Sequence, residues 1–171
     1  MMNKRVEEAI NEQINAELYS AYIYASMAAY FQAEGLPGFA NWMRVQFEEE
    51  QFHAFKFFDW VCERGGRVVL KAIEGPQTVW KDAVDVFETT LNHERHVTSL
   101  INNLMSVAIE EKDYASVNFL QWFVNEQVEE EANASKILDE LRMVYGNGHG
   151  MLMLDRELGA RVFTPPAASA E

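Results

Sequence analysis

The stretch FEEEQFHAFKF, residues 47–57, places Glu50 and His53 three residues apart inside a long segment with helical hydrophobic periodicity. In an α-helix, positions i and i+3 share a face, so the carboxylate and the imidazole can be aimed at one point. Single glutamates, Glu17 and Glu94, lie at a similar depth in two other periodic segments. Helical bundles that bind two metal ions combine glutamates from separate helices with Glu-x-x-His motifs. The sequence therefore predicts a two-metal site inside a four-helix bundle.

The periodicity of apolar residues predicts an all-α chain with one long crossover. Gly35, Pro37 and the pair Gly65-Gly66 mark the ends of the first two helices. Residues 66–79 are too many for a tight turn, and at about 3.3 Å per residue they can run the length of a bundle. The predicted helices are residues 3–33, 38–64, 79–110 and 114–145, with a short fifth helix at 151–160.

The predicted fifth helix follows a glycine-rich hinge at residues 146–150 and carries Met151, Leu154 and Leu158 on one side. So short a segment cannot maintain a helix alone in water, so it must pack on its own bundle or on a neighbouring subunit. We expect residues 1–146 to form the four-helix bundle and residues 147–171 to form the fifth helix and a flexible tail, loose from Thr164 onward.

Counting from the turns places the polar residues of both helical hairpins at one level. In the first hairpin, Glu17 precedes the Gly35-Leu36 turn by nearly the same number of residues as Glu50 and His53 follow it. In the second hairpin, Glu94 precedes Glu111 by nearly the same number of residues as Gln127 and Glu130 follow it. Because antiparallel helices rise equally on both sides of a turn, equal intervals meet at one depth. These positions, each of which interrupts an apolar stripe, are Glu17, Glu50, His53, Glu94, Gln127 and Glu130.

Several buried carboxylates at mid-bundle require either raised pKa values or bound cations. Carboxylate oxygens with one imidazole nitrogen favour iron or manganese, although zinc can compete. For any single position, misassigned periodicity or a core acid paired with Arg44, Arg64 or Arg95 is the more common explanation. Agreement in depth across four helices favours the metal site.

Other polar residues near these positions carry weaker signals. Tyr24 lies two turns from Glu17 on the same face, so its hydroxyl can approach the ligands, or it can be an ordinary core tyrosine. His93 and His96 point away from the face of Glu94, which predicts surface roles. Three further acids can form another cation site or can simply be solvated, namely Glu49, Glu126 and Glu129.

Composition excludes some classes of function. The chain has 27 acidic and 14 basic residues among 171, a formal net charge of −13, which repels nucleic acids and anionic membranes and attracts cations. The single cysteine, Cys62, precludes an internal disulfide and a cysteine-rich cluster, which is typical of the reducing cytoplasm, and we expect it to be a packing residue. The N-terminal residues lack the apolar core of a signal peptide, and no run of about 18 apolar residues predicts a membrane span.

At these motifs the chain resembles a bacterial non-haem ferritin, and the resemblance covers essentially the whole sequence. It includes NEQINAE at residues 11–17 and on through Tyr24, EEQFHA at residues 49–54, Glu94, NEQVEEE at residues 125–131 and the short last helix. The resemblance implies a ferritin-like four-helix bundle and a shell of 24 subunits, with the fifth helix at the four-fold axis.

The resemblance also implies a role for each candidate residue. Glu17, Glu50 and His53 would hold one iron and Glu50, Glu94 and Glu130 a second, with Glu50 bridging the two and Gln127 supporting the centre. Residues matching a third-iron site are Glu49, Glu126, Glu129 and Glu130.

The fourth helix offers Gln127-x-x-Glu130 where bacterioferritins have Glu-x-x-His, and Gln51 stands where they have a haem-ligating Met. We therefore expect no haem.

The function implied is iron storage and detoxification. Fe²⁺ would be oxidised by dioxygen or peroxide at a di-iron ferroxidase centre, and the ferric product would be stored as mineral in the shell. The alternatives are a di-iron oxygenase or reductase subunit, a peroxide-scavenging ferritin-like protein, and a metal-free helical interaction protein.

Overall fold

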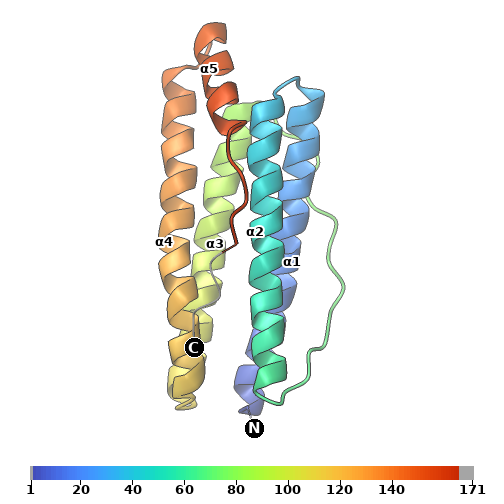
Figure 1. Ribbon diagram of the computed structural model, residues 1–171, viewed down its shortest axis with the longest axis vertical. Helices are drawn as coiled ribbons and strands as arrows, with labels where there is room; N and C mark the ends of the chain where they lie inside the picture. Colours follow the sequence, from blue (N-terminus) through green and yellow to red (C-terminus); the bar gives the residue numbers. More distant parts are fainter. Residues whose placement is uncertain (1, 166–171) are drawn as a thin grey trace.

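The computed structural model describes residues 2–165, which form five α-helices and no β-strand (Figure 1). Two antiparallel hairpins, α1 with α2 and α3 with α4, pack side by side, and the crossover after α2 runs along the outside of the bundle. The predicted all-α bundle with a long crossover and a short fifth helix is confirmed. The helices are α1 Lys4–Ala33, α2 Pro37–Glu63, α3 Ala83–Glu110, α4 Tyr114–Met143 and α5 Gly148–Leu158.

Side-chain caps explain where the predicted helix boundaries were wrong. The third helix begins at Ala83 rather than Val79, because the Asp82 carboxylate accepts a hydrogen bond from the Asp85 amide at 3.0 Å and caps the helix there. The fifth helix begins at Gly148, because the Asn147 side chain accepts from the His149 and Gly150 amides. Residues 148–150 are therefore the first turn of α5 rather than a hinge.

Two other expectations concern single positions. Cys62 is exposed on α2, so its prediction as a packing residue was wrong. The predicted loose tail lies for the most part outside the described residues, since the structure describes the chain only as far as Pro165.

The apolar core is divided into two clusters by a layer of buried polar residues. The cluster near α5 includes Phe31, Phe39 and Phe87, and the cluster at the opposite end includes Phe57 and Phe123, whose rings stack at 3.9 Å. Between them the helices bury the carboxylate and amide side chains predicted from the depth of the hairpins. Among residues 2–165, the fold therefore places its four buried glutamates at one level of the bundle.

The fifth helix is fastened to α2 by polar contacts as well as by apolar packing. Leu36, at the N-terminus of α2, has no side chain able to cap the helix, and Asp155 of α5 accepts from the Gly38 and Phe39 amides at 2.8 and 3.1 Å instead. A Cβ at Gly38 would lie 1.6 Å from the Asp155 carbonyl oxygen, so this close approach requires glycine. The packing partner predicted for α5 is thus its own bundle, where Leu154 and Leu158 are buried with α2 and α4.

Candidate metal centre

Glu17 from α1 meets Glu50 and His53 from α2 at the middle of the bundle. Each of the three offers one ligand atom, and these atoms lie within 4.8 Å of one another. All three residues are at most 3% exposed. His53 Nδ1 lies 3.3 Å from Glu50 Oε2, as expected for i and i+3 positions on one helical face. The structure therefore brings together the first three residues that the sequence singled out.

The carboxylate of Glu17 is incompletely satisfied. Its Oε1 accepts a hydrogen bond from Gln13 Nε2 at 2.7 Å, but its Oε2 is buried and has no partner among residues 2–165. An unpaired buried carboxylate oxygen is costly, so a native structure normally provides it with a ligand or a proton. Its position beside Glu50 and His53 fits a cation.

Glu94 of α3 belongs to the same layer and is 1% exposed. It accepts hydrogen bonds from the Tyr24 hydroxyl and, at 3.2 Å, from Gln127 Nε2. Gln127 also reaches Thr98 Oγ1 at 3.4 Å, which ties α3 to α4. Tyr24 is therefore both fully buried and in direct contact with a candidate ligand.

Glu130 of α4 completes the set of four buried carboxyl groups. Its Oε2 accepts from Gln46 Nε2 at 2.9 Å, and its side chain is almost fully buried. Gln46 and Gln13 were missed by sequence reasoning. Each precedes a ligand candidate by one helical turn, Gln13 before Glu17 and Gln46 before Glu50, and this i, i+4 spacing was the available signal.

Burial raises the pKa of every carboxyl group in this layer, and repulsion between the layer's own acids adds to the effect for Glu17, Glu50 and Glu130. Burial is the largest cause for each. It raises the pKa of Glu17 and of Glu50 well above the usual value, with the charge of Glu94 adding to the effect on Glu50. The pKa of Glu94 is also raised, and that of Glu130 is raised to about 8 by burial and then by Glu94. Positive charge at this level would restore the ionised forms.

The arginines that might have paired with these acids lie elsewhere. Arg64 binds Asp113 at 3.1 Å, Arg95 lies 3.9 Å from Glu131, and Arg44 is exposed. No ion pair between a Lys or Arg side chain and a carboxylate of the buried layer occurs among residues 2–165. The donor set of four carboxylates and one imidazole thus fits hard or borderline divalent cations such as Fe²⁺.

The residues predicted for a third site lie outside this layer, apart from Glu130. Glu126 Oε1 lies 3.9 Å from His53 Nε2, and Glu49 is held by Arg161 from the segment after α5. Burial raises the pKa of Glu126 and is the largest cause, the nearby His53 opposes it, and the net shift is upward. Glu129 is exposed. These three acids form a rim next to the centre rather than part of its tight group.

His93 does not have the surface role predicted for it. It is half-buried, its Nε2 lies 2.8 Å from Ser20 Oγ, and its ring packs edge-on against Tyr24. Burial, and then the charge of His96, lowers the pKa of His93 to about 4. His96 is exposed, as predicted.

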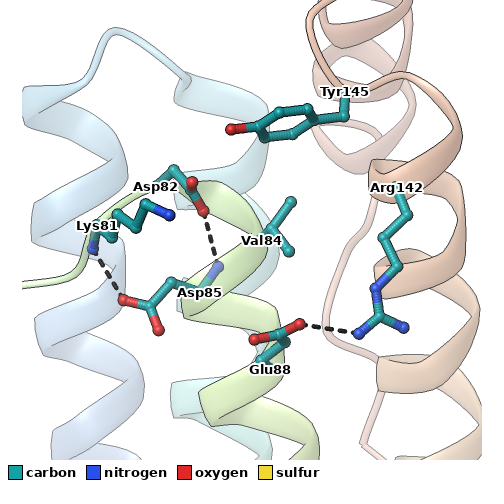
Figure 2. A pocket seen from close by; sticks show the side chains of 7 residues that line it. All are labelled: Lys81, Asp82, Val84, Asp85, Glu88, Arg142 and Tyr145. Atoms are coloured by element: carbon teal, nitrogen blue, oxygen red, sulfur yellow. Dashed lines mark hydrogen bonds and ion pairs between the residues drawn. The ribbon is translucent and has the colours of Figure 1, made fainter.

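A cavity of about 510 Å³ lies apart from this centre, where the start of α3 faces the end of α4 (Figure 2). Several of its polar groups pair with one another: Arg142 pairs with Glu88 at 2.8 Å, and the Lys81 amide donates to Asp85 Oδ2 at 2.8 Å. None of the predicted site residues lines it.

Within the described residues, no helix is both long and apolar enough to cross a bilayer.

The Ferritin family model, described as a ferritin-like domain, matches residues 7–144. The chain belongs to the ferritin family. This ferritin is 42% identical to a bacterial non-heme ferritin of Bacteroides fragilis over 161 residues, which are 94% of this chain and all of the relative. A probable bacterial non-heme ferritin-like protein of Haemophilus influenzae is 41% identical and covers 93% of this chain and 96% of the relative.

Solved structures agree with this ferritin along nearly its whole length. An engineered closed form of the Archaeoglobus fulgidus ferritin superposes with a TM-score of 0.95 at 52% identity, covering 96% of this chain and all of that one. The open-pore ferritin of the same archaeon gives a TM-score of 0.93 at 52% identity, covering 94% and 98% of the two chains. The resemblance to non-haem ferritins predicted from the motifs is confirmed.

Proposed function

We propose that this ferritin stores iron by oxidising Fe²⁺ at the buried layer of Glu17, Glu50, His53, Glu94 and Glu130. The observation that carries the proposal is the buried, unpaired Oε2 of Glu17 beside Glu50 and His53. A buried acid kept for an ion pair would have a basic partner at this position, and Glu17 Oε2 has none among residues 2–165. Iron is the substrate and cargo of the reaction rather than a resident cofactor.

Glu50 is the residue best placed to serve two ions. It touches the group of Glu17 and His53, and its pKa responds to the charges of Glu94 and Glu130. We therefore propose one ion on Glu17, Glu50 and His53 and a second on Glu50, Glu94 and Glu130. Gln127 and Tyr24 would orient Glu94 through their hydrogen bonds.

The reaction needs proton movement as well as electron transfer. Each Fe²⁺ gives up one electron, and dioxygen takes two electrons and two protons to form hydrogen peroxide. If peroxide is the oxidant, it takes two electrons and two protons to form two waters. The raised pKa values mean that the metal-free centre holds protons near neutral pH, so Fe²⁺ binding releases them.

Replacing Glu50 tests the centre directly. Glu50→Ala should lower the initial rate of Fe²⁺ oxidation by about 100-fold, because it removes the ligand that the two ions share. Glu48→Ala is the matched control, since Glu48 is an exposed glutamate on the same helix. The rate is followed by ferric absorbance and oxygen uptake within the first seconds. An unchanged rate in Glu50→Ala would remove this residue from the centre.

We further propose that the ferric product is stored as mineral in a shell of 24 subunits, with α5 at the four-fold axis. The family membership and the overlap with Archaeoglobus fulgidus ferritin support this assembly. In this proposal, residues 1–146 form the bundle that oxidises iron, and residues 147–171 make contacts around the four-fold axis. A cytoplasmic location is proposed from the single cysteine.

A further inference from the structure

The segment that follows α5 turns back along α2 (Figure 1). We name residues 159–165 the C-terminal strap. Asn41 of α2 fixes its start, because Asn41 Nδ2 donates to the carbonyl oxygens of Gly159 and Arg161 at 3.4 and 2.9 Å. Further along, the ring of Phe163 lies 6.3 Å from that of Phe52 on α2. Arg161 is therefore held on a backbone anchored on both sides.

Arg161 reaches from the strap to an acid of the third-site rim. Its Nη2 donates to Glu49 Oε2 at 2.6 Å, and its guanidinium carbon lies 4.6 Å from the centre of the Trp42 ring. Both members of the ion pair are 22% exposed, so water screens the attraction only in part. Arg161 Nη1 is buried and has no partner among residues 2–165, so Glu49 is the acid that holds the charge of the guanidinium.

Glu49 connects the rim to the buried centre. It directly precedes Glu50, and its negative charge contributes to the raised pKa values of Glu50, Glu126 and Glu130. A cation that binds Glu49 must share its carboxylate with the guanidinium, and two positive groups on one carboxylate repel each other. Arg161 therefore opposes cation binding at the rim without touching the ligands of the centre.

We propose that Arg161 is an internal counter-ion that competes with Fe²⁺ for Glu49 and keeps binding at the rim weak. The proposal rests on the proposed function, because the rim acts as a third iron site only if the centre binds iron. A weak rim lets iron pass on from the centre instead of remaining there. By linkage, a cation bound at the rim loosens the strap by the same factor.

The test is an anaerobic titration of the metal-free, assembled protein with Fe²⁺, in which isothermal titration calorimetry measures binding. Arg161→Gln should leave the two tight sites per subunit unchanged and tighten the weaker, third class of sites five- to tenfold. Lys136→Gln is the matched control. Lys136 lines the same surface cavity as Arg161 but pairs with Glu140 at 3.6 Å, so its loss should leave the third class unchanged.

Two further variants separate charge from packing. Arg161→Lys keeps the charge and should bind Fe²⁺ at the third class within about twofold of the unmodified protein. Glu49→Gln combined with Arg161→Gln should show no tightening, because the carboxylate in dispute is gone. Equal third-site affinity in Arg161→Gln and Lys136→Gln would overturn the proposal. Absence of the two tight sites in the unmodified protein would instead overturn the proposed function.

Discussion

Glu130 is a carboxyl group of the buried layer whose protonation links folding to pH. Burial, and then the negative charge of Glu94, raises its pKa from 4.5 to about 8. Between these two pH values the folded, metal-free protein holds a proton on Glu130 that the unfolded chain has released. The protonated form stabilises the fold, and this contribution is complete below pH 4.5 and is lost as the pH rises through about 8.

The thermal stability of the metal-free protein should therefore fall by several degrees between pH 6 and pH 9. Differential scanning calorimetry after metal removal measures this change. A saturating redox-inactive cation such as Zn²⁺ should abolish the decline, because it stabilises the ionised carboxylates. Glu130→Gln removes one of the titrating carboxyl groups and should make the decline shallower. Melting temperatures that stay level or climb over this range would contradict the raised pKa.

The residues of the centre were predictable because helical geometry converts sequence spacing into depth. The i, i+3 pair of Glu50 and His53 and the matched intervals on both sides of two turns place the candidate ligands at one depth without knowledge of side-chain conformations. The same geometry cannot say which way a flanking polar side chain turns, so Gln46 and its contact with Glu130 were missed. The contact of Arg161 with Glu49 could not be predicted from the sequence, because the strap has no hydrophobic periodicity that would place its residues.

At the scale of the helices, both hairpin turns contain one residue with a positive φ, but the residue type differs between the two turns. Gly35, between α1 and α2, has a φ of 74°, and Lys112, between α3 and α4, has a φ of 55°. In both turns the amide two residues after the last helical residue bonds back into the helix, at 3.4 Å for Gly35 and 3.0 Å for Lys112. A side chain at positive φ costs roughly 1 kcal/mol, which glycine avoids.

Lys112→Gly should therefore stabilise the protein by up to about 1 kcal/mol, or roughly 2–4 °C in melting temperature. Lys112 is exposed, and its side chain makes no hydrogen bond or ion pair within residues 2–165. Gly35→Ala is the mirror experiment and should destabilise by a similar amount, since nothing lies within 4 Å of the added Cβ and only the backbone conformation is affected. A melting temperature that drops in Lys112→Gly would show that the turn gains nothing from glycine.

The boundaries of the elements were less predictable than their existence. Hydrophobic periodicity located all five helices. It predicted too early a start for the third helix, at Val79, because Val79 and Trp80 are apolar and extend its apolar stripe. The structure buries Trp80 in the core cluster near α5 while leaving it outside the helix. The cap at Asp82 depends on one side-chain rotamer, which the apolar pattern does not encode.

At the scale of the whole molecule, the isolated subunit leaves large apolar side chains uncovered. The crossover exposes Leu70 and Val79 by 63% and 76%, and α1 exposes Tyr22 by 49%. Exposed apolar side chains gathered on one element are typical of protein interfaces. Within the proposed shell, neighbouring subunits would cover them.

The mass of the particle in solution tests this assembly. Twenty-four subunits of 19.6 kDa give a particle of about 470 kDa, to be measured by analytical ultracentrifugation or light scattering on freshly purified protein. Iron-loaded preparations should sediment faster still, because mineral adds mass inside a fixed volume. A particle of one or two subunits with two irons per chain would favour the oxygenase alternative instead.

The lone thiol of Cys62 makes this protein easy to tag. Because it is exposed on α2 and no second cysteine competes, a maleimide dye would attach at one defined place on every subunit. At 1.5 Å per residue that place lies about 18 Å along the helix axis from Glu50 and about 36 Å from Gly38. A fluorophore there would sit close enough to coloured ferric ions for quenching of its emission, yet far from α5, and would turn iron uptake into an optical signal.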